Sequence, residues 1–205
     1  MLSDADNEGV HLASFDKLTS KAIILFDLNC ERQGMKMMII RLAERELKTK
    51  FGVFTEILYY DGRSESIALV TGDVAENNDV LCRVHSHCIS AHIFNSIECD
   101  CREQMEFAQK LIENEGKGAV IWLDQEGKGN GHLALIQSMP FKKEFGQAEA
   151  YKMAGYKADN RTYLAAAQII SDLKIRSIIL LANDPAKADY LRDASIIVSG
   201  TRSLL

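Results

Sequence analysis

The sequence lacks a dense stripe of lysine and arginine, and its formal net charge at pH 7 is −5. Nucleic-acid backbones attract clustered positive charge, so this absence argues against DNA or RNA as the main partner. Local basic residues could still bind a small phosphate ligand. There is also no apolar run of membrane length, and acidic residues stand where a signal peptide needs a basic start and an apolar run. We therefore expect a cytoplasmic protein without a membrane partner.

The sequence also lacks internal repeats, low-complexity segments and a recognisable linker. A chain of 205 residues is long enough for one ample hydrophobic core and short for two. Residues 1–20 are polar and unpatterned, which predicts a mobile arm. Residues 21–205 are expected to form a single domain.

Apolar patterning in the first half predicts strands at residues 22–26, 51–60, 66–71 and 80–84. Residues 35–50 suit a helix or a strand about equally. Because turn residues separate the later strands, we expect this half to form an antiparallel meander.

The second half alternates between strands and helices, which indicates an α/β fold with parallel strands. Apolar residues recur at helical spacing from Met105, and Gly116 stands where a helix C-terminal cap belongs. Further elements are expected as a strand at 119–123, a helix at 160–173, a strand at 177–181, a helix opened by Pro185 and a strand at 196–198. The whole chain is thus predicted to be α/β, with a mixed, partly parallel sheet flanked by helices.

Three of the five cysteines, Cys88, Cys99 and Cys101, have a C-x10-C-x-C spacing that can close on one metal ion. A zinc ion with three protein ligands keeps a fourth position for water, which is typical of catalytic sites. His85, His87 or His92 could instead complete a closed structural site. The residues could also be simple buried thiols. The spacing alone leaves these alternatives open.

A glycine-rich segment follows the predicted strand at 119–123 and reads Asp-Gln-Glu-Gly-Lys-Gly-Asn-Gly-His at residues 124–132. Backbone N–H groups in such a loop can approach a phosphate closely, and Lys128 adds a point charge. The segment matches neither a Walker A loop nor a dinucleotide-binding fingerprint. Alone, it fits a plain flexible turn equally well.

Taken in order, R-V-H-S-x-C, C-x-C-x-x-Q, Q-E-G-[RK]-x-x-G, D-x-R and N-x-P-x-K resemble the motifs of GTP cyclohydrolase II. The resemblance covers about residues 40–199. That family opens the guanine ring of GTP as the first step of riboflavin synthesis. The resemblance therefore implies that residues 21–205 form a catalytic domain of this kind.

The resemblance assigns the zinc ligands to Cys88, Cys99 and Cys101, with one zinc ion per chain that activates water for attack on C8 of guanine. It also assigns Arg161 to the α-phosphate as pyrophosphate leaves, with Asp159 as its base. In a purely structural alternative, Asp159 caps the helix that follows and Arg161 is a solvated first-turn residue.

The resemblance places the nucleotide contacts at Arg83, Val84, His85, Ser86, His87, Gln104, Glu126, Gly127, Lys128 and Lys187. Two of these have ordinary structural alternatives. Gln104 could cap the first helix of the second half, and Lys187 could be a surface lysine. If the resemblance holds, Gln104 reads a purine edge and Lys187 binds phosphate near a helix N-terminus.

Several positions depart from the family pattern. His87 replaces a carboxylate, Lys128 replaces an arginine, Ala182 replaces a threonine, and Ala91-His92 replaces Gly-Asp. Met139 aligns with a family tyrosine near the attacked carbon. Because a thioether cannot donate a proton, we predict that the main product keeps its formyl group. Alternatively, Met139 fills space in the core and another side chain, such as His132, supplies the proton.

These observations predict a zinc-dependent enzyme that opens the imidazole ring of a purine nucleotide, GTP, and releases pyrophosphate. A second hydration at the same carbon would release formate. Mg2+ is expected on the nucleotide phosphates, and the resemblance implies a homodimer. One alternative is a paralogue with another nucleotide substrate, or one that stops at the formamide. A second alternative is a nucleotide-binding protein with a structural Cys3His zinc site and no turnover.

Overall fold

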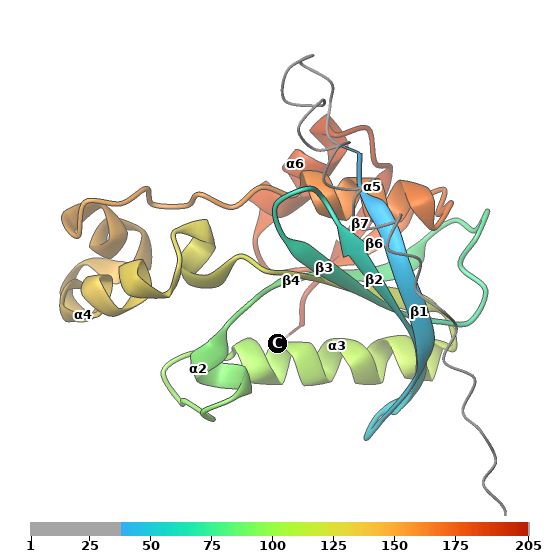
Figure 1. Cartoon of the computed structure of the whole chain (residues 1–205), viewed down its shortest axis with the longest axis horizontal. Helices are drawn as coiled ribbons and strands as arrows, with labels where there is room; N and C mark the ends of the chain where they lie inside the picture. The colour runs from blue at the N-terminus through green and yellow to red at the C-terminus, as the bar shows by residue number, and fades with distance from the viewer. Residues whose placement is uncertain (1–37, 205) are drawn as a thin grey trace, which may run out of the picture. The chain divides into compact units, whose positions relative to one another are not determined.

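A computed structural model describes residues 38–204, in which one mixed sheet has the strand order β1-β2-β3-β5-β4-β6-β7 (Figure 1). The predicted mobile arm at 1–20 and the predicted strand at 22–26 lie outside the described residues. The strands are β1 (Ile40–Thr49), β2 (Gly52–Tyr60), β3 (Glu65–Thr71), β4 (Val80–Ser86), β5 (Gly118–Leu123), β6 (Ile178–Leu181) and β7 (Val198–Arg202).

Strands β1, β2 and β3 form an antiparallel meander, in which β2 and β3 were predicted. The ambiguous stretch at 35–50 contains a strand, β1, which is mostly exposed, so its apolar residues carry no clear period. The turn between β2 and β3 is held by Asp61, whose Oδ1 accepts hydrogen bonds from Arg63 N at 2.9 Å and Ser64 N at 2.8 Å.

Strand β4 does not continue the meander, contrary to expectation. It pairs in parallel with β5 on one side and with β6 on the other, while β3 pairs antiparallel with β5. The chain therefore crosses the sheet between β3 and β4, and β5 later inserts between them. A sequence pattern shows that a strand exists but not which neighbour it pairs with. Strand β4 would bury the same residues whether it paired with β3 or with β5.

The helices of the parallel half are α3 (Cys101–Glu115), α5 (Leu164–Asp172) and α6 (Pro185–Asp193). Gly116 ends α3 in the left-handed conformation, with φ 72°, and Pro185 opens α6, both as predicted. Helix α5 begins later than the predicted residue 160. The preceding segment is instead tied to the glycine-rich loop, because Asn160 N donates to Lys128 O at 2.9 Å. Likewise, the last strand begins at Val198, two residues after the predicted start at 196.

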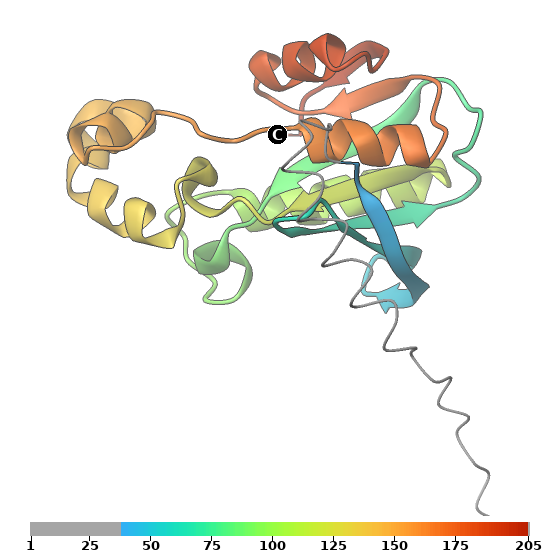
Figure 2. The ribbon, with the colours of Figure 1, turned by 45° about the horizontal axis from the view of Figure 1, so that its top comes forward.

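Helix α3 covers one face of the sheet, and α5 and α6 cover the other (Figures 1 and 2). The alternation of β4 explains this layering, since Cys82 and Val84 belong to the core under α5 and α6, and Leu81 belongs to the core under α3. Among the described residues, no helix is both long and apolar enough to span a membrane.

The longest helical element, α4 (His132–Met153), was not predicted. It follows the short 3-10 turn η1 (Glu126–Gly129) and lies away from the sheet in both views (Figures 1 and 2). Gly146, with φ 73° and ψ 168°, breaks α4 into two segments. Because the break interrupts the helix, its apolar residues do not follow a single helical period.

Candidate active site

The predicted site residues converge at the carboxyl ends of the adjacent parallel strands β5, β4 and β6. Ligands of open parallel sheets commonly bind at this edge, where the loops leave the strands. A pocket of about 390 Å³ lies here. It is lined by every predicted site residue except Val84 and Asp159, and both of these contact residues that do line it.

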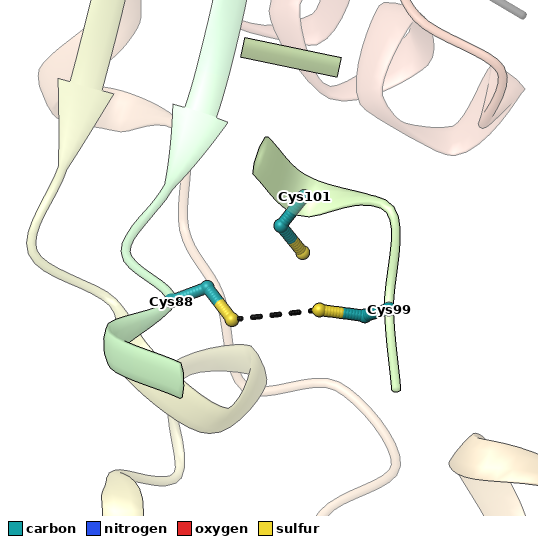
Figure 3. A group of neighbouring side chains, drawn as sticks. All are labelled: Cys88, Cys99 and Cys101. Atoms are coloured by element: carbon teal, nitrogen blue, oxygen red, sulfur yellow. Dashed lines mark hydrogen bonds between the residues drawn. The ribbon is translucent and has the colours of Figure 1, made fainter. Parts of the chain in front are cut away.

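The three predicted metal ligands come together from separate segments (Figure 3). Cys88 precedes the short helix α2 (Ile89–His92), Cys99 lies in the loop after it, and Cys101 is the first residue of α3. Their sulfur atoms all lie within 4.8 Å of one another, and those of Cys88 and Cys99 are 3.8 Å apart. Tetrahedral zinc with Zn–S bonds of about 2.3 Å would set its sulfurs roughly 3.8 Å apart, so the thiols fit a zinc ion.

No histidine joins this group of close ligand atoms in the part of the chain that the structure describes. His85, His87 and His92 were the candidates for a fourth protein ligand. His87 instead places Nδ1 3.1 Å from Asp124 Oδ1, and the ring of His92 lies 5.0 Å from that of His85. The arrangement is therefore one of three thiols beside a pocket, as an open metal site requires.

Two links hold the cysteine segments in place. Arg102, which follows Cys101 on α3, donates from Nε to Ala91 O of α2 at 2.9 Å. Glu126 of η1 accepts a hydrogen bond from Ile89 N at 2.7 Å. The predicted nucleotide contact Glu126 thus also ties the start of α2 to the glycine-rich loop.

Arg83 is buried in β4 and organises the base of the pocket. Its Nη1 donates to Leu181 O at 2.8 Å, and its Nη2 donates to Gln104 Oε1 at 2.6 Å. The amide of Gln104 also donates to Asp100 Oδ2 at 2.8 Å, so its orientation is fixed from both sides. Gln104 does not cap α3, because Asp100 occupies the cap position.

His85 lies beside Arg83, with its Nδ1 3.3 Å from Arg83 Nη2. Burial, followed by the charge of Arg83, lowers the pKa of His85 to about 2, so the imidazole is neutral. A guanidinium can only donate, hence Nδ1 is the acceptor and Nε2 carries the proton. The protonated Nε2 is buried and has no partner in the described residues, so His85 offers the pocket a hydrogen-bond donor.

Lys187 is almost completely buried, with 5% of its surface exposed, so the surface-lysine alternative is wrong. Its Nζ donates to Val84 O at 2.8 Å. Burial, then the positive charges of Arg83 and Arg161, lower the pKa of Lys187 to about 7. An anion that enters the pocket would favour its charged form.

Arg161 stands next to Lys187, and the two cations lie 5.6 and 5.5 Å from the ring centroid of Tyr163. Arg161 Nε donates to Asp159 Oδ1 at 3.0 Å. The alternative in which Asp159 caps α5 is wrong, because α5 begins at Leu164 and Tyr163 holds the cap position. Asp159 instead holds in place the guanidinium that the family resemblance assigns to phosphate.

The glycine-rich loop is hydrogen-bonded to the segment that carries Arg161. Gln125 exchanges two hydrogen bonds with the backbone of Thr162, at 2.8 and 3.1 Å. A Cβ added to Gly129, whose φ is 76°, would lie 2.8 Å from the backbone of Asn160, so only glycine fits there. This contact brings Lys128 and Arg161 to the same pocket.

Helix α4 supplies pocket residues that sequence reasoning missed, chiefly Tyr151, Gln147 and Lys142, together with the predicted Met139. The Tyr151 hydroxyl is buried and has no hydrogen-bond partner in the described residues. Its position follows from the break at Gly146, which turns the second segment of α4 back toward Gly127. Apolar residues do not recur at helical spacing along α4, so no signal in the sequence indicated that these residues would reach the pocket.

Comparison with known proteins decides the family. Residues 40–203 match the family model of GTP cyclohydrolase II. The chain belongs to the GTP cyclohydrolase II family. Among this family's curated members, the riboflavin biosynthesis protein RibBA of Bacillus cereus (strain ATCC 14579) is 40% identical over 170 residues, which cover 82% of this chain and 43% of that protein.

RibBA of Bacillus mycoides (strain KBAB4) is 39% identical over 182 residues, which cover 87% of this chain and 46% of that protein. This member of the GTP cyclohydrolase II family thus spans less than half the length of these relatives. Among solved structures, the two-domain 3,4-dihydroxy-2-butanone 4-phosphate synthase RibBX from A. baumannii has a TM-score of 0.42 at 16% identity, over 78% of this chain and 43% of that chain, a likeness too weak to support an argument.

Proposed function

We propose that this chain opens the imidazole ring of GTP in a zinc-dependent reaction and releases pyrophosphate. The observation that carries the proposal is a single pocket lined at one place by three converging thiols and at another by Arg83, Arg161 and Lys187. Ring opening at C8 and cleavage after the α-phosphate require these two chemistries on one substrate. Membership of the GTP cyclohydrolase II family supports the same reaction.

A zinc ion held by Cys88, Cys99 and Cys101 would lower the pKa of water and so supply the nucleophile for C8 near neutral pH. The other steps belong to the chain's own side chains. The amide of Gln104, fixed by Arg83, is set to recognise the purine edge, and Arg161 and Lys187 are set to hold the phosphates. Mg2+ would accompany the phosphates.

One observation favours a second candidate, a paralogue that stops at the formamide. Met139 lines the pocket at the position where the family resemblance places a tyrosine. Release of formate requires a proton on the leaving nitrogen, and a thioether cannot supply it. The inert Cys3His alternative has no such support, since no histidine belongs to the metal-ligand group among the described residues.

The relatives are named riboflavin biosynthesis proteins, so we place the reaction in that pathway. The homodimer and the cytoplasmic location stay predictions.

The direct test is to incubate the zinc-loaded protein with GTP, ATP and GDP, and to analyse the products by mass spectrometry together with assays for pyrophosphate and formate. We expect a ring-opened product and pyrophosphate from GTP. Equal rates with ATP would move the assignment to another purine nucleotide. Unchanged nucleotides with fully zinc-loaded protein would contradict it.

A further inference from the structure

A second carboxylate faces the cations at the phosphate end of the pocket. Asp184 caps α6 by accepting a hydrogen bond from Ala186 N to its Oδ1, at 3.0 Å. Its other oxygen, Oδ2, lies 3.9 Å from Arg161 Nη2. Asp184 lines the pocket, and its side chain is 52% exposed.

Neither of two structural roles requires the negative charge of Asp184. Asparagine and serine cap helices about as well as aspartate, because the cap needs only a side-chain oxygen. The orientation of Arg161 is set by Asp159, which accepts a hydrogen bond from Nε at 3.0 Å. At 3.9 Å, the contact between Asp184 and Arg161 is too long for a hydrogen bond and is purely electrostatic.

The charge does affect what an anion meets in the pocket. Arg161 and Lys187 supply two positive groups, and Asp159 and Asp184 stand beside them as two negative ones. A phosphate that reaches Arg161 therefore comes close to the Asp184 carboxylate. Like charges at short distance repel, and the repulsion grows with the charge of the ligand.

We propose that Asp184 is a specificity-determining residue that occupies Arg161 in the free protein and weakens the binding of bare nucleotide phosphates. The inference rests on the proposed function, in which Arg161 and Lys187 hold the phosphates of GTP. The site then selects a nucleotide whose phosphate charge is offset by a divalent cation. Nucleotides with fewer phosphates experience a smaller penalty.

Asp184→Asn and Asp184→Ser test this proposal, because both keep a capping oxygen and remove the charge. The zinc-loaded proteins are titrated calorimetrically with GTP, GMP and inorganic pyrophosphate at pH 6.5 without added Mg2+. The acidic pH is chosen to favour the charged form of Lys187, because the variants lose the Asp184 charge, which raises the pKa of Lys187. We expect both variants to bind GTP about threefold to tenfold more tightly, an effect discounted for the exposure of the side chain. The gain should be smaller for GMP, and it should shrink when Mg2+ is added.

Asp189→Asn is the matched control, because Asp189 lies on the same helix and pairs with Arg192 at 2.9 Å, outside the pocket lining. This variant should bind all three ligands as the unmodified protein does. Unchanged or weaker GTP binding by Asp184→Asn, or an equal gain in the control, would overturn the proposal.

The two ligand types separate this inference from the proposed function. Tighter binding of GTP and pyrophosphate by Asp184→Asn, in a protein that does not open the ring of GTP, would support the role of Asp184 and refute the proposed function. If the unmodified protein opens the ring of GTP, and Asp184→Asn binds GTP with the same affinity as the unmodified protein, the proposed function is supported and the role of Asp184 is refuted. Failure of every protein to bind either ligand would overturn both.

Discussion

Replacing Lys187 by methionine should stabilise the protein while it removes one of the cations proposed to bind phosphate. In the folded state the pKa of Lys187 is lowered from 10.5 to about 7, chiefly by burial. Each pKa unit corresponds to roughly 1.4 kcal/mol, so burying the charged ammonium lowers the free energy of unfolding by about 4 to 5 kcal/mol at pH values below 7. The methionine variant avoids this cost and leaves the carbonyl of Val84 without its donor, a loss of about 1 kcal/mol. A net gain of about 3 kcal/mol is therefore expected near pH 7.

The dependence of this gain on pH identifies its cause. Between pH 7 and pH 10.5 the unfolded state binds the proton of Lys187 and the folded state does not, so the unmodified protein gains stability as the pH rises. The advantage of Lys187→Met should consequently shrink by about 2 kcal/mol between pH 7 and pH 9. Urea unfolding of both zinc-loaded proteins at several pH values measures this difference directly.

Lys110→Met is the control, because Lys110 is exposed on α3. Its free energy of unfolding should follow that of the unmodified protein at every pH. A difference between Lys187→Met and the unmodified protein that stays constant from pH 7 to pH 9 would refute the argument, since it would show that Lys187 keeps an ordinary pKa.

Three further outcomes are expected. Changing any one of the metal-site cysteines, Cys88, Cys99 and Cys101, to serine should abolish both zinc binding, measured by atomic absorption, and ring opening. Arg161→Ala should slow pyrophosphate release about a hundredfold or more and leave the zinc content unchanged, because in the proposed function the guanidinium acts on the phosphate end. Met139→Tyr should increase formate release relative to ring opening, since it restores a proton donor worth about a hundredfold to ten-thousandfold.

Each outcome has its own control. Cys82→Ala removes a buried thiol from the core and should leave the zinc content unchanged, so zinc loss there would point to general instability. Arg192→Ala removes an exposed ion-paired arginine and should keep the normal rate of pyrophosphate release. Stoichiometric formate from the unmodified protein would show that Met139 is not limiting and that another side chain supplies the proton.

The group of three cysteines was the most predictable part of the chain. The spacing of Cys88, Cys99 and Cys101 allows all three to close on one metal ion, and in the structure their sulfur atoms do lie within 4.8 Å of one another. Strands β5 and β6, whose carboxyl ends border the pocket, were equally predictable, because each is a short apolar run followed by polar residues. Cysteine spacing and short apolar runs involve only residues that are close in the sequence, so the sequence alone is enough to predict these features.

Features that depend on distant contacts were not predictable. The burial of Lys187 follows from the packing of α6 against β4, which no local pattern records. The late start of α5 follows from the hydrogen bond between Asn160 and Lys128, across the glycine-rich loop. Helix α4 was not predicted because the break at Gly146 interrupts its helical period, and Tyr151 was missed with it.

The most direct test of the central claim, an open metal centre inside the nucleotide pocket, is X-ray absorption spectroscopy of the zinc-loaded protein. Three sulfur ligands at about 2.3 Å and one oxygen at about 2.0 Å are predicted, because the described residues place three thiols and no imidazole within reach of one ion. An imidazole nitrogen in the fourth position, or a fourth sulfur, would show a closed structural site and would contradict the account.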